Sequence, residues 1–226
     1  RGVILKQALT RKTDSSVVII RIMATVFILG CHIAPFVNIP FISQFLNVGV
    51  QIFLMISGYL CAMKEIDSGL KWIYNRYIRI FIPIIIFVLF LAIYSNCANI
   101  YNGFLPILVY VFGIQGIGFL EGYYVPPRYL GTDHLWFITV LFICYLLVLL
   151  ISKLKVKFTE KNSLMFLGIF FVVSLLTPFV KIYTSYFIIF FAGYFFCKFY
   201  EKRFSLKAYI ITSILMVAII ILRLLS

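Results

Sequence analysis

Two titratable residues lie inside the first long apolar stretch of the chain, Val17–Ala34. Arg21 and His32 are eleven residues apart, which turns an α-helix by about three full turns. Both side chains are therefore expected on one helical face, about 16 Å apart along the axis. Inside a membrane helix such groups are costly and usually mark a pathway or a site. We expect this face to line a polar cavity, because facing lipid would leave both groups unpaired.

His32 is a candidate general base, because an imidazole titrates near neutral pH and can take a proton from a hydroxyl group. The structural alternatives are a membrane-interface anchor for Arg21 and a hydrogen-bonded helix-packing role for His32. The second histidine, His134, precedes Leu135 and Trp136 and is either another acid or base or an interfacial polar residue. No metal site is expected, since the chain has only these two histidines and its five cysteines are scattered.

Two further motifs carry candidate residues. Arg76 and Arg79 are three residues apart, so they are expected on one helical face. Guanidinium groups bind phosphate through paired hydrogen bonds, which makes this pair a candidate anchor for an anionic cofactor from the cytoplasm, with anchoring to anionic lipid as the alternative. In Gly49–Leu60, Ser57 and Gly58 are small enough for close helix packing, and Ser57 can also donate a hydrogen bond into a cavity.

The elements that must hold these side chains are membrane helices. The chain has 226 residues, 64% of them hydrophobic and 12% charged, whereas soluble domains are about half apolar and about a quarter charged. Its apolar blocks have the length that crosses the hydrocarbon core of a bilayer. This excludes a soluble or disordered protein and predicts an all-α, polytopic transmembrane bundle of seven spans. The predicted spans are Val17–Ala34, Asn47–Met63, Ile80–Ser95, Leu135–Ser152, Ser163–Val180, Tyr183–Tyr200 and Ala208–Leu222.

An eighth apolar block, Phe104–Leu120, contains glycines that weaken a helix, so its status depends on where the basic residues lie. If it does not cross and the N-terminus is inside, seventeen of the twenty Lys and Arg residues are on the inner side; if it crosses, twelve are. We therefore predict a re-entrant or interfacial segment on the outer face, whose backbone other helices must bury. The same distribution explains the net charge of +13 without nucleic acid as a partner.

These motifs, in this order, resemble those of the acyltransferase 3 family of integral membrane acyltransferases. The resemblance covers nearly the whole chain. It rests on the Arg21-x10-His32 spacing, GVQIFLMISGYL at Gly49–Leu60, RYIRIFIP at Arg76–Pro83 and HLWF at His134–Phe137. Family members are bundles of about ten spans, which implies that residues 1–226 form a single membrane acyltransferase-like domain lacking the last two or three helices.

The resemblance implies transfer of an acyl group, typically acetyl from acetyl-CoA, onto a hydroxyl of an extracytoplasmic carbohydrate such as a surface polysaccharide. The family's first-helix arginine and histidine match Arg21 and His32, which implies a catalytic role for this pair. Its arginines at the third-helix entrance match Arg76 and Arg79, here spaced Arg-x2-Arg rather than the Arg-x-Arg of some members. With Arg21 they would hold the CoA phosphates, so acyl-CoA is expected as a co-substrate, with no tightly bound cofactor. The expected location is the bacterial cytoplasmic membrane with the N-terminus inside.

Two other interpretations stay open. A polar residue deep in the membrane also marks the pathway of a transporter or a flippase for a lipid-linked saccharide. Such folds often contain internal repeats, and none is detectable in this sequence. The other interpretation is a non-catalytic remnant, which the absence of the last helices of the family keeps open.

Overall fold

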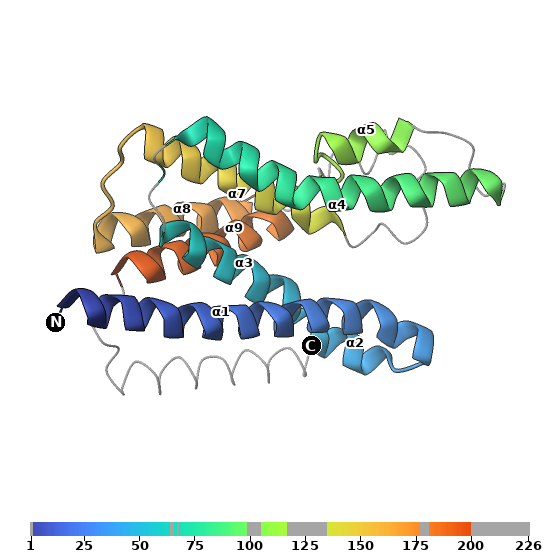
Figure 1. Cartoon of the computed structure of the whole chain (residues 1–226), viewed down its shortest axis with the longest axis horizontal. Coiled ribbons are helices and arrows are strands. Elements are labelled where there is room, and N and C mark those ends of the chain that lie inside the picture. The colour runs from blue at the N-terminus through green and yellow to red at the C-terminus, as the bar shows by residue number, and fades with distance from the viewer. Residues whose placement is uncertain are drawn as a thin grey trace.

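The computed structural model describes residues 2–63, 66, 68–98, 105–116, 135–176 and 181–199, and every regular element in these ranges is a helix. Figure 1 shows long helices that lie side by side along one direction. The predicted all-α class is therefore confirmed. The elements are α1 (Gly2–Ile33), a 3-10 turn (Ala34–Val37), α2 (Pro40–Leu46), α3 (Val48–Ala62), α4 (Gly69–Cys97), α5 (Leu105–Val111), α7 (Trp136–Lys153), α8 (Glu160–Leu176) and α9 (Lys181–Phe199).

Three described stretches are long and apolar enough to cross a membrane. They are Phe41–Ala62, Gly69–Cys97 and Trp136–Lys153. Shorter apolar helical segments cover Val17–Ile33, Lys161–Val173 and Ser185–Phe199. These six overlap six of the seven predicted spans, and the seventh, Ala208–Leu222, lies outside the described residues. The number of spans accordingly stays a prediction.

Two helices begin well before the spans predicted from hydropathy. α1 begins at Gly2 rather than near Val17, and α4 begins at Gly69 rather than at Ile80. The added segments contain Lys, Arg and Leu residues, which favour helix. They also carry too many charges to be recognised from hydropathy as membrane-spanning. As a result Arg76 and Arg79 lie inside α4 rather than in the loop that leads to it.

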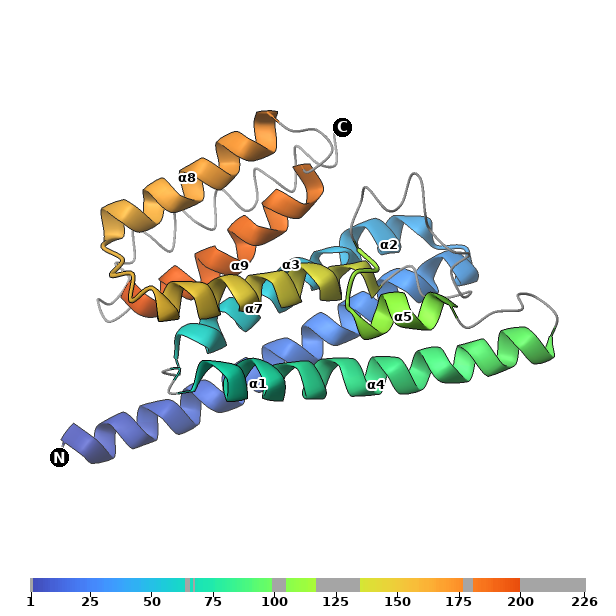
Figure 2. The ribbon, with the colours of Figure 1, turned by 90° about the horizontal axis from the view of Figure 1, so that it is seen from above.

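α7 occupies the centre of the bundle. Figure 2 shows it between α4 on one side and the α8–α9 pair on the other, and it also contacts α3. Its buried side chains include Val140, Leu141 and Val148, which pack in one apolar core with Leu54 of α3 and Phe190 of α9. A helix buried on several sides is apolar around most of its circumference, as this sequence is.

α3 packs most extensively against α9, and two glycines allow the close approach. A Cβ at Gly58 would meet the backbone carbonyl of Phe190, and a Cβ at Gly193 would meet that of Met55. The predicted role of Gly58 in close helix packing is thus confirmed. α3 also crosses α1 closely, where Gly49 lies against the backbone of Ala24.

The described part of the eighth apolar block is not a span. Its helix α5 has seven residues, which extend about 10 Å against the roughly 30 Å of a bilayer core. After α5 the chain turns at Gly113, whose φ of +67° favours glycine. The turn is held by hydrogen bonds from the Gly116 amide to Thr139 Oγ1 (3.0 Å) and from Gln115 Nε2 to the Leu135 carbonyl (3.2 Å). Neighbouring helices therefore bury this backbone, as predicted for a re-entrant segment; residues 117–120 lie outside the described ranges.

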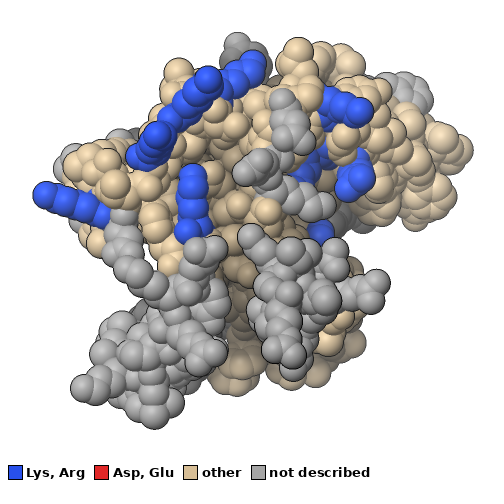
Figure 3. Space-filling view, turned by 60° about the vertical axis from the view of Figure 1, so that its left-hand side comes forward, with Lys and Arg blue, Asp and Glu red and all other residues tan. Residues whose placement is uncertain are grey.

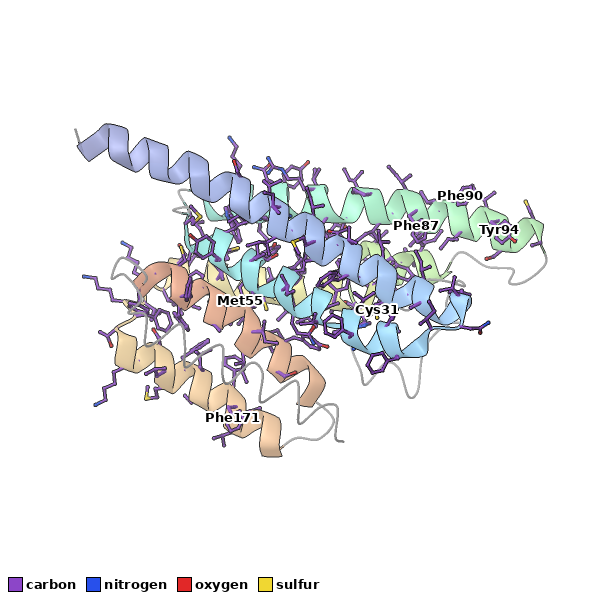
Figure 4. The ribbon with its side chains drawn as sticks, turned by 90° about the horizontal axis from the view of Figure 1, so that it is seen from below. Cys31, Met55, Phe87, Phe90, Tyr94 and Phe171 are labelled. Carbon is purple, nitrogen blue, oxygen red and sulfur yellow. The ribbon has the colours of Figure 1, made fainter. Side chains whose placement is uncertain are left out.

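Large apolar side chains cover much of the outer surface of the described helices. Phe87, Phe90 and Tyr94 on α4 and Phe171 on α8 are exposed, and Figure 4 shows where they lie on these helices. A soluble protein seldom exposes a continuous apolar surface of this extent. This surface is what a helix bundle in contact with lipid requires.

Candidate functional site

Arg76, one of the predicted site residues, has well-defined contacts in the structure. It is half-buried on α4, and its guanidinium carbon lies 5.4 Å from the centre of the Trp72 ring and 5.1 Å from that of Tyr145. Trp72 belongs to the preceding turn of α4, whereas Tyr145 comes from α7. The two rings meet edge to face, with centres 5.8 Å apart. Arg76 therefore points into the bundle, between α4 and α7.

Tyr145 connects Arg76 to two further candidates. Its side chain is 3% exposed and interacts electrostatically with Arg76 and Arg21. Its hydroxyl lies within hydrogen-bonding reach of the Ser57 hydroxyl. Ser57 Oγ in turn donates a hydrogen bond of 2.8 Å to the Phe53 carbonyl. Four helices, α1, α3, α4 and α7, each supply one member of this group. We refer to Arg21, Ser57, Arg76 and Tyr145 as the arginine cluster.

Arg21 reaches the cluster from α1. Its guanidinium carbon lies 5.7 Å from the centre of the Phe53 ring, and the residue is exposed. The α1–α3 crossing, where Gly49 packs against the backbone of Ala24, holds Arg21 beside α3. A guanidinium over an aromatic ring keeps its charge and N–H donors while gaining a favourable contact.

His32 lies in the last turn of α1, on the same helix as Arg21. The predicted single helix through both residues is confirmed, and it separates them by about 16 Å along the axis. Both side chains are exposed, so the described part of the chain does not close the predicted polar cavity over this face, which stays a prediction.

The remaining predicted residues lie apart from the arginine cluster. Arg79 is exposed on α4, so the two arginines of the predicted pair have different surroundings. Trp136, in the first turn of α7, is half-buried and packs its ring against Tyr186 of α9, with centres 4.9 Å apart. His134 lies outside the described residues, and no group of metal-binding side chains occurs among those that the structure describes.

Tyr145 is the one cluster member that sequence reasoning missed. It sits in the run LFICYLLVLL, where a tyrosine has no motif around it and resembles the many aromatic residues of the chain. Its hydroxyl at the centre of a predicted span was the available signal, because a polar group there needs a partner.

One end of the bundle is basic. Figure 3 shows Lys and Arg side chains gathered on the face that it views, and Figure 1 places the ends of helices that carry them together. The members of this basic end are Lys71 on α4, Lys153, Lys155 and Lys157 at and after the end of α7, Lys161 on α8 and Lys198 on α9. Arg76 follows Lys71 by five residues, about 8 Å further along α4. The grouping agrees with the prediction that these residues share one side of the membrane.

An open groove of about 630 Å³ between α4 and α7 lies nearby. Its lining is apolar and aromatic apart from Lys71, and it does not include Arg76. The groove therefore lacks the convergent polar groups of the arginine cluster.

Comparison with known protein families settles what the sequence motifs suggested. The model of the acyltransferase 3 family, described as an acyltransferase domain, matches residues 14–226. The chain belongs to the acyltransferase 3 family. No curated protein and no solved structure matches it.

The chain is therefore an integral membrane acyltransferase, and nothing supports the alternative of a transporter. In this acyltransferase the arginine cluster offers two guanidinium groups, a serine hydroxyl and a tyrosine hydroxyl from four different helices. Groups of this kind bind anions and orient them, whereas the imidazole of His32 on α1 is suited to proton transfer.

Proposed function

We propose that this acyltransferase takes an acyl group, typically acetyl, from acyl-CoA that arrives at the basic end and transfers it to a hydroxyl of a carbohydrate beyond the opposite side of the membrane. The observation that carries the proposal is the placement of the Arg76 guanidinium on the Tyr145 ring between α4 and α7, with Arg21 of α1 near enough to act on Tyr145 electrostatically. Paired guanidinium groups are the side chains best suited to bind phosphate. In this proposal the basic end faces the cytoplasm of a bacterium, as the positive-inside rule predicts.

The spacing along α1 supports a division of labour between the arginines and His32. The CoA molecule has phosphates at one end and the thioester at the other, with the extended pantetheine arm between them. Phosphates held by Arg21, Arg76 and Arg79 leave the arm free to run along α1. His32 is about 16 Å from Arg21 along that helix, which puts it on the side of the reacting thioester.

The transfer needs one base and balances without a further reactant. The acceptor hydroxyl oxygen attacks the thioester carbonyl carbon, the carbon–sulfur bond breaks, and CoA leaves as a thiolate. His32 takes the hydroxyl proton during attack and returns it to the thiolate. Because a thiolate leaves readily, holding donor and acceptor in the correct orientation supplies much of the remaining rate enhancement.

Membrane vesicles that contain the chain test this proposal with acetyl-CoA labelled in the acetyl group. We expect label to enter the carbohydrate fraction in wild-type vesicles and to fall to the level of vesicles without the chain in His32→Ala. A matched control is Asn162→Ala, which removes an exposed polar side chain in the first turn of α8 and should transfer label normally. Wild-type transfer by a folded His32→Ala protein would contradict the role of His32. Label recovered only in lipid or protein would contradict a carbohydrate acceptor.

A further inference from the structure

The two aromatic rings that hold Arg76 come from different parts of the chain. Trp72 is four residues before Arg76, so helix geometry alone places it alongside. Tyr145 is brought in by the packing of α7 against α4. Both ring centres are within the distance of about 6 Å at which a guanidinium is attracted to an aromatic face.

We propose that Tyr145 is a positioning residue that, together with Trp72, holds the Arg76 guanidinium in the orientation that binds the anionic part of the acyl-CoA donor. The inference rests on the proposed function, and it concerns a residue that neither the motifs nor the family match identifies. Rings set at 82° to each other leave a guanidinium in contact with both of them few orientations. A side chain fixed in this way loses less conformational freedom when the donor binds.

The contacts of Tyr145 explain why it can fix its neighbour. Its ring is buried and packs edge to face on Phe190 of α9, with centres 5.9 Å apart. Its hydroxyl lies beside Ser57, whose own position is set by the hydrogen bond to the Phe53 carbonyl. Tyr145 is therefore held from α3 and from α9 and presents a rigid surface to Arg76.

The attraction between the Arg76 guanidinium and the aromatic rings also leaves its charge available to a ligand. An aromatic ring attracts a guanidinium without neutralising it, so the N–H donors of Arg76 keep their charge for an incoming phosphate. A carboxylate in the same place would bind those donors itself. Among the side chains that the structure describes, none is an Asp or a Glu, and the Arg76 guanidinium lies over the two aromatic rings named above.

Calorimetric titration of the full chain in detergent with acetyl-CoA tests the proposal. Tyr145→Phe keeps the ring and loses the hydroxyl, whereas Tyr145→Leu loses the ring. We expect Tyr145→Leu to weaken acetyl-CoA binding about tenfold and Tyr145→Phe to weaken it less than about threefold. Tyr110→Leu removes an equally buried tyrosine ring that packs on the far half of α4, and it should leave the affinity within about twofold.

A double-mutant cycle separates positioning from a general structural effect. If Tyr145 acts through Arg76, Tyr145→Leu should change the affinity of an Arg76→Ala protein by less than about twofold. Equal losses of about tenfold in both backgrounds would overturn the inference. If Tyr145→Leu does not fold, Trp72→Leu removes the other, half-buried ring and should lower the affinity in the same Arg76-dependent way.

The two proposals fail in different ways. Wild-type protein that is folded and does not bind acetyl-CoA would contradict the proposed donor, and the role of Tyr145 with it. Wild-type binding that is unchanged in folded Tyr145→Leu would overturn the role of Tyr145 alone.

Discussion

Arg76 and Arg79 show how far one helical turn can separate the surroundings of two like residues. Arg76 is half-buried against Trp72 and Tyr145, whereas Arg79 is exposed on the same helix. A spacing of three residues rotates a side chain by about 60° from a full turn, which is enough to move it across the edge of an interface. From their spacing alone, the two arginines would be expected to have the same surroundings. The packing of α7 against α4 gives them different surroundings.

This difference gives a prediction for the conservative substitutions of both arginines. Lysine keeps the positive charge but lacks the flat guanidinium that stacks on rings and binds phosphate through paired hydrogen bonds. We therefore expect Arg76→Lys to weaken acetyl-CoA binding about tenfold, or about 1.4 kcal/mol, and Arg79→Lys to weaken it less than about threefold. Calorimetric titration of the two purified variants measures the difference. Equal losses of acetyl-CoA affinity in the two variants would show that the different surroundings of Arg76 and Arg79 have no effect on donor binding.

Residue types and spacing predicted most of the candidate site but not its arrangement. Arg21, His32, Ser57 and Arg76 all stand out because a polar or charged residue near or within an apolar run needs an explanation. Tyr145 does not stand out, because its importance comes from contacts with Arg76 and Ser57, 69 and 88 positions earlier in the chain. Such contacts depend on how helices pack and leave no periodic signal in the sequence.

At the scale of elements, apolar runs predicted helix positions better than helix lengths. The ends of α3 and α7 lie within one residue of the predicted spans Asn47–Met63 and Leu135–Ser152. α1 and α4 begin more than ten residues before their predicted spans. Hydropathy detects only the part of a helix that suits the hydrocarbon core. Charged residues that favour helix lengthen the helix beyond that part without raising its hydropathy.

The α3–α9 contact gives a prediction about stability. Gly58→Ala or Gly193→Ala places a methyl group against the backbone of the facing helix, where no side chain can move aside. We expect a loss on the order of 1–3 kcal/mol in the free energy of unfolding, because overpacking forces the two helices apart. Thermal unfolding in detergent measures this as a lower midpoint.

A matched control for the same measurement lies on α8. A Cβ at Gly168 meets nothing within 4 Å, so Gly168→Ala should be neutral or stabilising by up to about 1 kcal/mol. A midpoint for Gly58→Ala as high as that for Gly168→Ala would refute close packing of α3 against α9.

At the scale of the whole molecule, the lysines that the structure describes gather at one end of the bundle. The basic end carries six lysines on four helices and the loop after α7, and Arg76 lies about 8 Å further along α4. Exposed charges act over roughly a Debye length, about 8–10 Å at physiological ionic strength. The lysines of the basic end can therefore attract an anionic donor before it reaches the arginine cluster.

Ionic strength tests this long-range contribution. We expect acetyl-CoA association to slow several-fold when salt rises from about 0.05 M to about 0.5 M, because screening shortens the reach of the exposed lysines. Lys155→Ala/Lys157→Ala removes two exposed charges from the loop after α7 and should reduce this salt dependence while changing the dissociation rate little. Stopped-flow mixing measures both rates. An association rate that does not respond to salt would rule out steering by the basic end.

The central claim is that the arginine cluster binds the acyl-CoA donor, and one titration tests it directly. Acetyl-CoA is titrated into the purified chain in detergent, comparing wild type with Arg76→Ala/Arg79→Ala and with Lys155→Ala/Lys157→Ala, which removes the same charge elsewhere on the basic side. The account predicts saturable binding to wild type and to the lysine variant, and a loss of at least about a hundredfold in affinity in the arginine variant. Equal affinity in all three folded proteins, or no binding by wild type, would contradict it.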